Sequence, residues 1–285
     1  MKLQLSIVIL CCLIACADKK GPAKKAPAGD TLHYDLTNPQ KFYMPDILYE
    51  ISGIAFSSND DTIYAEQDEE GILFHFKPGS NTIIQSKFGK KGDFEDVAIY
   101  NNIVIMLRSD GVLFTFPLSE ANNNHITGTK QLTGLLPAGE YEGLYADAAG
   151  NKLYALCKHC SDGKTSKYGG GYIFNITTDG SVSPAGSFGI NVKDIEALTG
   201  EKKITFHPSA LAKNLVSNQW YILSSVNKLL VVADSNWQVK QVYPLNPSLF
   251  VQPEGIAFDK QNNLYISNEG STTSSGNILK FTYKP

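Results

Sequence analysis

The chain has 285 residues, a formal net charge of -3 and 42% hydrophobic residues. This balance excludes the concentrated basic surface that nucleic-acid binding needs, so no nucleic-acid partner is expected. Tyr, Phe, Ile and Val are prominent among the apolar residues, while Gly and Asn mark turns. This usage is typical of a soluble all-β body with a large core.

The first part of the chain has the pattern of an export signal followed by a tether. Residues 1–15 join a short positive end to an apolar run that is too short to span a bilayer, which indicates a signal peptide. Leu13-Ile14-Ala15-Cys16 looks like the lipobox of a bacterial lipoprotein, which predicts acylation of Cys16. An ordinary secretory signal with a coincidental cysteine is the alternative. Residues 16–31 lack large apolar side chains and predict a flexible tether.

Acylation predicts a partner and a location for the chain. Several acyl chains anchor a protein stably, so the expected partner is a membrane reached through the lipid on Cys16. No Asp immediately follows Cys16, which favours the outer membrane of the cell envelope, facing the periplasm or the exterior.

Residues 32–285 are expected to form a single domain, because one short sequence motif, called a phrase below, recurs along them. Its clearest copy starts at Pro253, where an alternating apolar strand, a polar turn and a second alternating strand predict an antiparallel pair. The copies align on their second residues, which are Gly53, Asp96, Gly143, Ala210 and Gly255. Three of the four steps are about 45 residues long, near the length of one four-stranded propeller blade.

A second phrase, a glycine followed by an aliphatic and aromatic strand, repeats in the same register at residues 71–76, 111–116, 171–176 and 276–281. The two phrases together predict an all-β fold, a β-propeller of four-stranded antiparallel blades. Five blades are preferred. The phrase around Glu196, within the long third step, either opens a sixth blade or is an insertion. After Gly255 there is room for three strands only, so the N-terminal segment 32–49 is expected to close the ring and remove an open edge.

The two cysteines of the expected mature body, Cys157 and Cys160, lie in a Cys-Lys-His-Cys sequence. In an exported protein without a second such pair, a disulfide is the favoured interpretation. Free thiols, a zinc half-site and a redox pair remain the alternatives.

Polar residues recur where strands begin and end at one face of the predicted propeller. Strand starts carry Glu95, Glu142 and Glu254, with Ser52 and Ser209 at the matching positions of the other blades. The ends of the second strands carry Asp68, Arg108, Lys158, Asn227, Asn268 and Glu269. All of these side chains are expected around one mouth of the central channel.

The three strand-start glutamates need a compensating charge. Carboxylates within about 6 Å repel by about 3 kcal/mol per pair at an effective dielectric constant near 20. A hard cation such as Ca²⁺, which accepts oxygen ligands in variable geometry, is one answer. Neutralisation by Arg108 and Lys158, with raised carboxylate pKa values, is the other. Glu196 would add a fourth carboxylate if its phrase reached the channel.

At these residues the chain resembles the SdiA-regulated family of bacterial propeller proteins, distant relatives of NHL-repeat propellers. The resemblance covers about residues 45–285 and rests on the segments 50–54, 94–97, 141–144, 156–158, 206–211, 223–228 and 252–257. It implies a five-bladed propeller with bound calcium and no established activity.

The favoured function is therefore a membrane-anchored extracytoplasmic propeller that binds calcium and an unidentified small-molecule or protein ligand. A calcium-dependent esterase, lactonase or phosphoesterase using the same mouth is one alternative, and an envelope scaffold is another. His207 is the only histidine in an inner-strand phrase, although a packed histidine is its plainer interpretation. The chain lacks the Gly-x-Ser-x-Gly and His-Glu-x-x-His motifs, so no catalytic residue is predicted.

Overall fold

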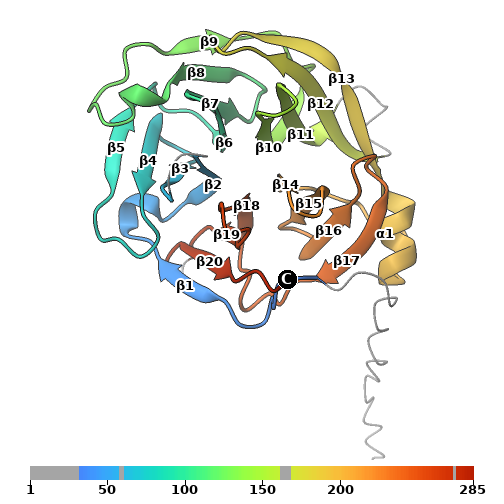
Figure 1. The fold of residues 1–285 in the computed structure, drawn as a ribbon. Helices are drawn as coiled ribbons and strands as arrows, with labels where there is room; N and C mark the ends of the chain where they lie inside the picture. Colours follow the sequence, from blue (N-terminus) through green and yellow to red (C-terminus); the bar gives the residue numbers. More distant parts are fainter. Residues whose placement is uncertain (1–31, 58–60, 161–167, 272–273) are drawn as a thin grey trace, which may run out of the picture.

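A computed structural model describes residues 32–57, 61–160, 168–271 and 274–285. Within these residues, twenty strands form five four-stranded antiparallel sheets that surround a central axis as blades (Figure 1). The chain is a five-bladed β-propeller, which confirms the fold predicted from the repeated phrases. The predicted signal peptide, Cys16 and the tether lie outside the described residues.

Each blade is a meander whose first strand lies at the channel and whose last strand lies at the rim (Figure 1). Blades 1 and 2 contain β2 (Ile51–Phe56), β3 (Ile63–Gln67), β4 (Ile72–Phe76) and β5 (Ile84–Lys87), then β6 (Phe94–Tyr100), β7 (Ile103–Arg108), β8 (Leu113–Pro117) and β9 (Lys130–Leu132). Blades 3 and 4 contain β10 (Gly139–Asp147), β11 (Lys152–Cys160), β12 (Tyr168–Ile176) and β13 (Val182–Asn191), then β14 (Ala210–Asn214), β15 (Gln219–Ser224), β16 (Leu229–Ala233) and β17 (Val239–Pro244).

Blade 5 is built from both ends of the chain. Its strands, from the channel outward, are β18 (Pro253–Phe258), β19 (Leu264–Asn268), β20 (Asn277–Phe281) and β1 (Gln40–Tyr43). β1 pairs antiparallel with β20, with Gln40 opposite Lys280 and Tyr43 opposite Asn277. The N-terminal strand therefore closes the ring as predicted, because it covers the edge that β20 would otherwise leave unpaired.

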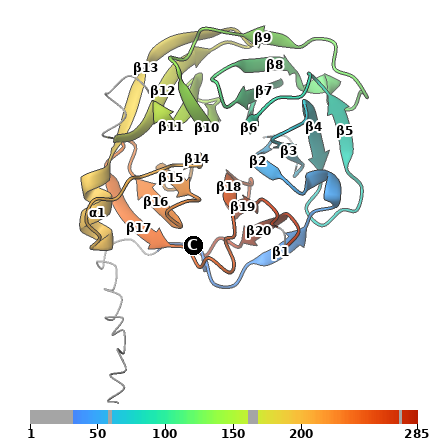
Figure 2. The same cartoon turned by 180° about the vertical axis from the view of Figure 1, so that it is seen from behind.

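Short helices lie outside the sheets. The 3-10 helices η1 (Asp46–Leu48) and η2 (Leu118–Glu120) follow β1 and β8. The only α-helix in the described residues, α1 (Val192–Thr199), contacts β17 at the rim of blade 4, as both views show (Figures 1 and 2). None of the helices in this part of the chain is long and apolar enough to cross a membrane.

The phrase around Glu196 belongs to α1 and opens no blade. The Asn191 side chain accepts a hydrogen bond from the Lys193 N–H, which caps the start of the helix, and Gly200 ends it with a positive φ of 77°. Ile195 is the one buried residue of this helix, and it joins the core cluster that contains Phe188 and Trp220, with Val192 packed against the same cluster. The long third step is therefore an insertion, and the number of blades is five.

The core lies between neighbouring blades. Tyr154 of β11 and Trp220 of β15 meet with ring centroids 4.6 Å apart, which joins blades 3 and 4. Trp237 stacks on Trp220 at 4.2 Å and on Phe188 at 3.9 Å. Because the sheets pack face to face around a ring, each blade needs both neighbours to bury its side chains.

Close approach at the channel explains the glycine of the repeated phrase. A Cβ added at Gly53 would lie 2.2 Å from Oδ1 of Asp96, which occupies the same position one blade further on. The buried Asp96 carboxylate accepts hydrogen bonds from the N–H groups of Val97, at 2.8 Å, and Leu144, at 2.6 Å. The Asp96 side chain of blade 2 thus packs against blade 1 and accepts a hydrogen bond from blade 3.

Candidate functional site

A β-bulge places each strand-start glutamate. In blade 2, Phe94 pairs with Arg108 and Asp96 with Leu107, so Glu95 has no partner in the ladder. The same shift leaves Glu142 unpaired between β10 and β11, and Glu254 unpaired between β18 and β19. A bulge changes the direction of a side chain and commonly lies beside a functional site. Blade 1 has the same kind of shift between Ile51 and Ile54, so the irregularity repeats at four of the five blades.

The innermost strands all begin at one end of the channel, and we call the region of Glu95, Glu142 and Glu254 the acidic mouth. A cavity of 320 Å³ opens there, and Glu142 and Glu254 both line it. The other lining residues are Lys158, His207, Pro208, Ser209, Ser225, Val226, Lys228 and Gln252. The structure thus brings two of the predicted metal ligands to a common cavity.

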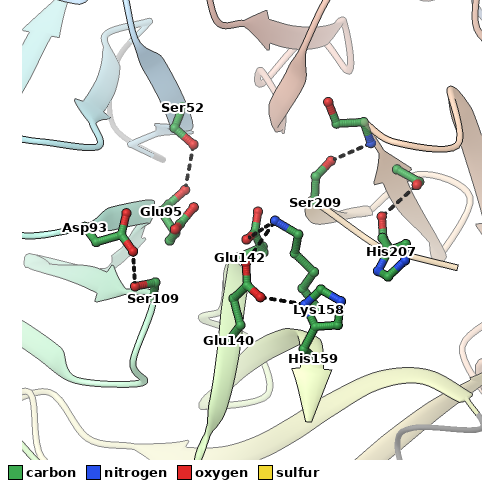
Figure 3. A network of polar contacts seen from close by, with 12 residues as sticks. Ser52, Asp93, Glu95, Ser109, Glu140, Glu142, Lys158, His159, His207 and Ser209 are labelled. Atoms are coloured by element: carbon green, nitrogen blue, oxygen red, sulfur yellow. Dashed lines mark hydrogen bonds and ion pairs between the residues drawn. The ribbon is translucent and has the colours of Figure 1, made fainter.

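Lys158 is the central cation of the acidic mouth. Its Nζ lies 2.8 Å from Oε1 of Glu142 and 3.1 Å from Oε1 of Glu140 (Figure 3). Burial lowers the pKa of Lys158, but its hydrogen bonds to the two glutamates outweigh burial and leave the pKa raised. Nδ1 of His159 lies 2.5 Å from Oε2 of the same Glu140. An internal ion pair therefore neutralises Glu142, as one of the two predicted alternatives requires.

Glu95 and Glu254 are not compensated in the same way. Burial raises the pKa of Glu95, and the charge of the neighbouring Glu142 raises it further. Burial also raises the pKa of Glu254 to about 7, again with the charge of Glu142 as the next cause. Lys158 is already shared by Glu142 and Glu140, and the second lysine of the cavity, Lys228, lies near Glu254 and donates to the Val251 carbonyl oxygen. The mouth therefore holds more carboxylates than lysines.

Acidic residues continue from the mouth into blade 1, where the sequence analysis named only Asp68. Glu66 of β3 is fully buried, and its Oε1 accepts the Gly53 N–H at 2.6 Å. Among the described residues, Oε2 of Glu66 and Oδ1 of Asp68 are buried without a hydrogen-bond partner. Burial and the charge of Glu50 raise the pKa of Asp68 to about 6. An acidic residue inside the apolar run of β3 was the available sequence signal for Glu66.

The serines at the matching positions hold the ring together. The Ser52 hydroxyl donates to the Glu95 carbonyl oxygen at 3.0 Å, and the Ser209 hydroxyl donates to the Pro253 carbonyl oxygen at 2.8 Å. Each bond joins one inner strand to the next. Ser52 therefore acts as a link between blades, while Ser209 acts as a link and also lines the cavity.

Other predicted mouth residues have local partners. Arg108 pairs with Asp110, with Nη2 and Oδ2 2.8 Å apart, instead of with the channel glutamates. Oδ1 of Asn227 accepts the His207 N–H at 3.1 Å, which fixes the segment that carries the histidine. Glu196 lies on α1 at the rim, where its Oε1 accepts the Ile204 N–H at 3.0 Å. It does not reach the channel, because its phrase forms a helix outside the ring.

The end of β19 contributes two further predicted residues. Asn268 is fully buried and donates through Nδ2 to Oδ1 of Asn277 at 3.2 Å. Oε2 of Glu269 accepts from Nε2 of Gln252 at 2.6 Å, and burial together with the charge of Asp68 raises the pKa of Glu269 to about 7. Glu269 therefore adds to the excess of carboxylate on this side of the mouth.

His207 lines the cavity beside a second histidine. Its ring centroid lies 4.8 Å from that of His159 (Figure 3). Burial lowers the pKa of His207, and the nearby charges of His159 and Lys158 lower it further. Nδ1 of His207 is buried and has no hydrogen-bond partner among the described residues. His207 thus lies at the cavity wall with a lowered pKa and with its buried Nδ1 unpaired in the described chain.

Cys157 and Cys160 are joined by a disulfide in the structure, with their Cα atoms 5.9 Å apart. The bond encloses Lys158 and His159 at the end of β11. It fixes the short segment that supplies the basic side chains of the mouth.

Comparisons with known proteins bear on the family and the fold of the chain. The SdiA-regulated family matches residues 31–272, most of the chain. The chain belongs to this family. No curated protein matches it in sequence. The family match therefore identifies the relatives of this member of the SdiA-regulated family, but it assigns no activity to the chain.

Solved structures share the fold at low sequence identity. A glutaminyl cyclase from Myxococcus xanthus is 15% identical with a TM-score of 0.55, covering 86% of this chain and 94% of its own. A PQQ-bound aldose sugar dehydrogenase from Streptomyces coelicolor is 11% identical with a TM-score of 0.53, covering 86% and 98%. A calcium-binding regucalcin from Agrobacterium tumefaciens is 12% identical with a TM-score of 0.51, covering 88% and 96%. At these identities the likeness shows the fold alone.

Proposed function

We propose that this member of the SdiA-regulated family is a lipid-anchored binding module of the cell envelope, whose acidic mouth binds calcium and a polar ligand. One observation carries the proposal: the carboxylates of the mouth, several of them buried with raised pKa values, outnumber its two lysines, Lys158, which already serves Glu142 and Glu140, and Lys228. A bound cation supplies the missing positive charge.

The residues present have the chemistry that calcium requires. Glu95, Glu142 and Glu254 would hold the ion, and they offer carboxylate oxygens, the ligands that Ca²⁺ prefers. The unpartnered oxygens of Glu66 and Asp68 lie in the neighbouring blade and extend the same oxygen-rich region. Among the described residues, no group of three or more His, Cys, Asp and Glu side chains is arranged to hold a metal ion, so the three glutamates would have to move closer together to share one. Regucalcin, which shares the fold, is a calcium-binding protein.

Calorimetric titration with CaCl₂ after chelation tests the cation. We expect binding by the parent chain and at least a tenfold loss with Glu254→Gln, which removes one of the proposed ligand carboxylates. Lys158→Gln should strengthen binding several-fold, because it frees Glu142 from its internal partner. Glu196→Gln, at the rim, is the matched control and should bind like the parent. Absence of any binding heat in the parent, or equal losses with Glu254→Gln and Glu196→Gln, would contradict the proposal.

The anchor is tested separately, because it rests on the lipobox alone. We expect the full chain to partition into membranes when expressed with its signal, and Cys16→Ser to appear in the soluble fraction. Metabolic labelling with a palmitate analogue should mark the parent and leave Cys16→Ser unlabelled. A labelled Cys16→Ser variant, or an unlabelled parent, would remove the anchor from the proposal without affecting the calcium site.

A second candidate, hydrolysis of an ester, lactone or phosphoester at the same mouth, is favoured by one observation. His207 lines the cavity and has a lowered pKa, which are two properties of a general base. A screen of aryl esters, lactones and aryl phosphates with and without calcium tests it. Activity that is lost in His207→Gln would support catalysis, and activity that His207→Gln retains would exclude this residue as the base.

A further inference from the structure

Two glutamates and two lysines line the cavity of the acidic mouth, and only one glutamate and one lysine pair with each other. The Glu142 carboxylate pairs with Lys158, whose Nζ lies 2.8 Å from Oε1 (Figure 3). The other two are Lys228 and Glu254. In the part of the chain that the structure describes, neither of them forms an ion pair with a side chain. The cavity wall therefore carries one cation and one anion that are available to a ligand.

Lys228 has hydrogen-bonding capacity left. Its Nζ donates to the Val251 carbonyl oxygen at 2.5 Å, and an ammonium group has three N–H donors, so two remain. The residue lies in the turn between β15 and β16 with a φ of 51°, a left-handed conformation that Gly and Asn adopt more readily. The Leu245 N–H donates to its carbonyl oxygen at 2.8 Å, which holds this conformation. A lysine held in an unfavourable backbone conformation beside a cavity indicates that its side chain is used.

Glu254 also has capacity left. The bulge between β18 and β19 removes it from the ladder, and its carboxylate has a hydrogen bond with the Ser225 side chain. A carboxylate accepts about four hydrogen bonds, so most of its capacity is unused. Removing a carboxylate from water costs free energy unless a positive group neutralises it, and the charge of the nearby Glu142 makes that cost larger. An ammonium group on a ligand would neutralise Glu254 and donate to its oxygens.

The charges of Lys228 and Glu254 act on each other across the cavity. Burial lowers the pKa of Lys228, and the charge of Glu254 opposes this effect. A ligand with a positive charge alone would bind Glu254 but would be repelled by Lys228, and a ligand with a negative charge alone would meet the reverse. A ligand that carries both charges gains from both side chains.

The cavity selects a small ligand. Its volume of 320 Å³ lies at the lower limit of ligand pockets, which span about 300–1,000 Å³. The polar side chains of Ser209, Ser225 and Gln252 continue its wall, and Pro208 and Val226 supply its apolar part. This lining suits a compact polar molecule with a short side chain.

We infer that the polar ligand of the acidic mouth is a small zwitterion, a free α-amino acid, whose ammonium group binds Glu254 and whose carboxylate binds Lys228. The inference rests on the proposed function in taking the mouth as the ligand site, but it does not depend on calcium. Calcium and the ammonium group would both use the Glu254 carboxylate, so the two compete.

Calorimetric titration of the full chain in EDTA at pH 8 tests the inference, with glycine, L-alanine and L-serine as the probes. L-alaninamide, which lacks the carboxylate, and N-acetyl-L-alanine, which lacks the ammonium group, are the matched controls. We expect all three amino acids to bind, since the zwitterion is common to them. Each one-charge analogue should bind at least tenfold more weakly than L-alanine.

Two substitutions assign the charges to side chains. Lys228→Met should reduce the affinity for L-alanine at least tenfold, to that for L-alaninamide, and Glu254→Gln should reduce it to that for N-acetyl-L-alanine. Lys240→Met is the control and should bind like the parent, because Lys240 pairs with Asp234 at 3.0 Å in blade 4, away from the cavity. Unchanged melting temperatures show that the variants are folded, and the analogue series with the parent chain does not depend on them.

Other outcomes separate the inference from the calcium site. A chain that binds calcium but none of the three amino acids overturns the inference alone, whereas amino-acid binding without calcium binding overturns only the calcium part of the proposed function. Equal affinity for L-alanine and either analogue would mean that one charge is not recognised, which also overturns the inference. Where both ligands bind, CaCl₂ should weaken L-alanine binding several-fold, and an unchanged affinity would remove Glu254 from the amino-acid site.

Discussion

At the residue scale, the acidic mouth contains glutamates in different states. Glu142 has an ion-pair partner in Lys158, whereas burial and the charge of Glu142 raise the pKa of Glu254 to about 7. Glu269, at the end of β19, also has a pKa of about 7. Carboxyl groups with such values change charge near neutral pH, so the mouth is able to change its charge without a change in fold.

The calcium-free protein should lose stability as the pH rises from about 5 to about 8. Glu254 and Glu269 bind protons more tightly in the folded state than in the unfolded state, because their folded pKa values of about 7 lie above the ordinary value of 4.5. Their contribution is present below the unfolded pKa and is lost as the pH rises through the folded pKa. Glu254 contributes up to about 3 kcal/mol, at about 1.4 kcal/mol per pKa unit, and the half-exposed Glu269 contributes less because solvent screens its interactions.

Urea unfolding in EDTA at both ends of this pH range measures the effect. Glu254→Gln should flatten the pH dependence, since an amide does not titrate, and Glu196→Gln at the rim should leave it unchanged. Constant stability across the range, or the same flattening by both variants, would mean that Glu254 does not carry the dependence.

At the element scale, neighbouring inner strands are joined by specific polar contacts as well as by apolar packing. Asp96 lies against Gly53 of blade 1 and accepts the N–H of Leu144 from blade 3. The Ser52 hydroxyl bonds to the next blade through the Glu95 carbonyl oxygen. Because these contacts lie directly beside the bulges, they also hold the strand starts that present the glutamates.

Asp96→Ala should destabilise the fold by about 2–4 kcal/mol, because it leaves the buried Leu144 N–H without an acceptor and opens a cavity beside Gly53. Ser52→Ala removes a single hydrogen bond and should cost about 1 kcal/mol. Thermal or denaturant unfolding at fixed pH ranks the two variants. Equal losses, or a loss below 1 kcal/mol for Asp96→Ala, would contradict its role as the three-blade link.

At the scale of the whole molecule, the ring depends on its N-terminal segment. β1 supplies the outer strand of blade 5, and Tyr34 bridges Asn214 of blade 4 and Asn262 of blade 5. Without this segment, β20 would have an open edge and the two blades would lose a shared buried side chain.

A chain that begins at residue 46 should therefore aggregate or unfold without cooperativity, whereas one that begins at residue 32 should be monomeric and melt in one transition. The milder Tyr34→Phe should cost about 1–2 kcal/mol, since Asn214 and the Asn262 carbonyl each lose a partner. Size-exclusion chromatography and calorimetry test both variants. A residue-46 chain that melted like the longer one would show that β1 is dispensable for closure.

The sequence by itself determined the propeller, the number of strands available to blade 5 and the closing role of the N-terminal strand. The reason is that the alternation of side chains along a strand and the repeat of about 45 residues are local sequence patterns. They are the same whatever the position of the blade in the ring. Glu142 and Glu254 were likewise found at the mouth because they occupy equivalent positions in the repeat.

Only the tertiary structure decided which charges meet. The bulges that free Glu95, Glu142 and Glu254 from the ladders depend on the register between strands, which no single strand specifies. The pairing of Arg108 with Asp110 and the buried Glu66 depend on which blade faces lie opposite each other. Glu196 shares the repeated phrase yet lies at the rim, because its segment forms a helix, capped by Asn191 and ended by Gly200, instead of an inner strand.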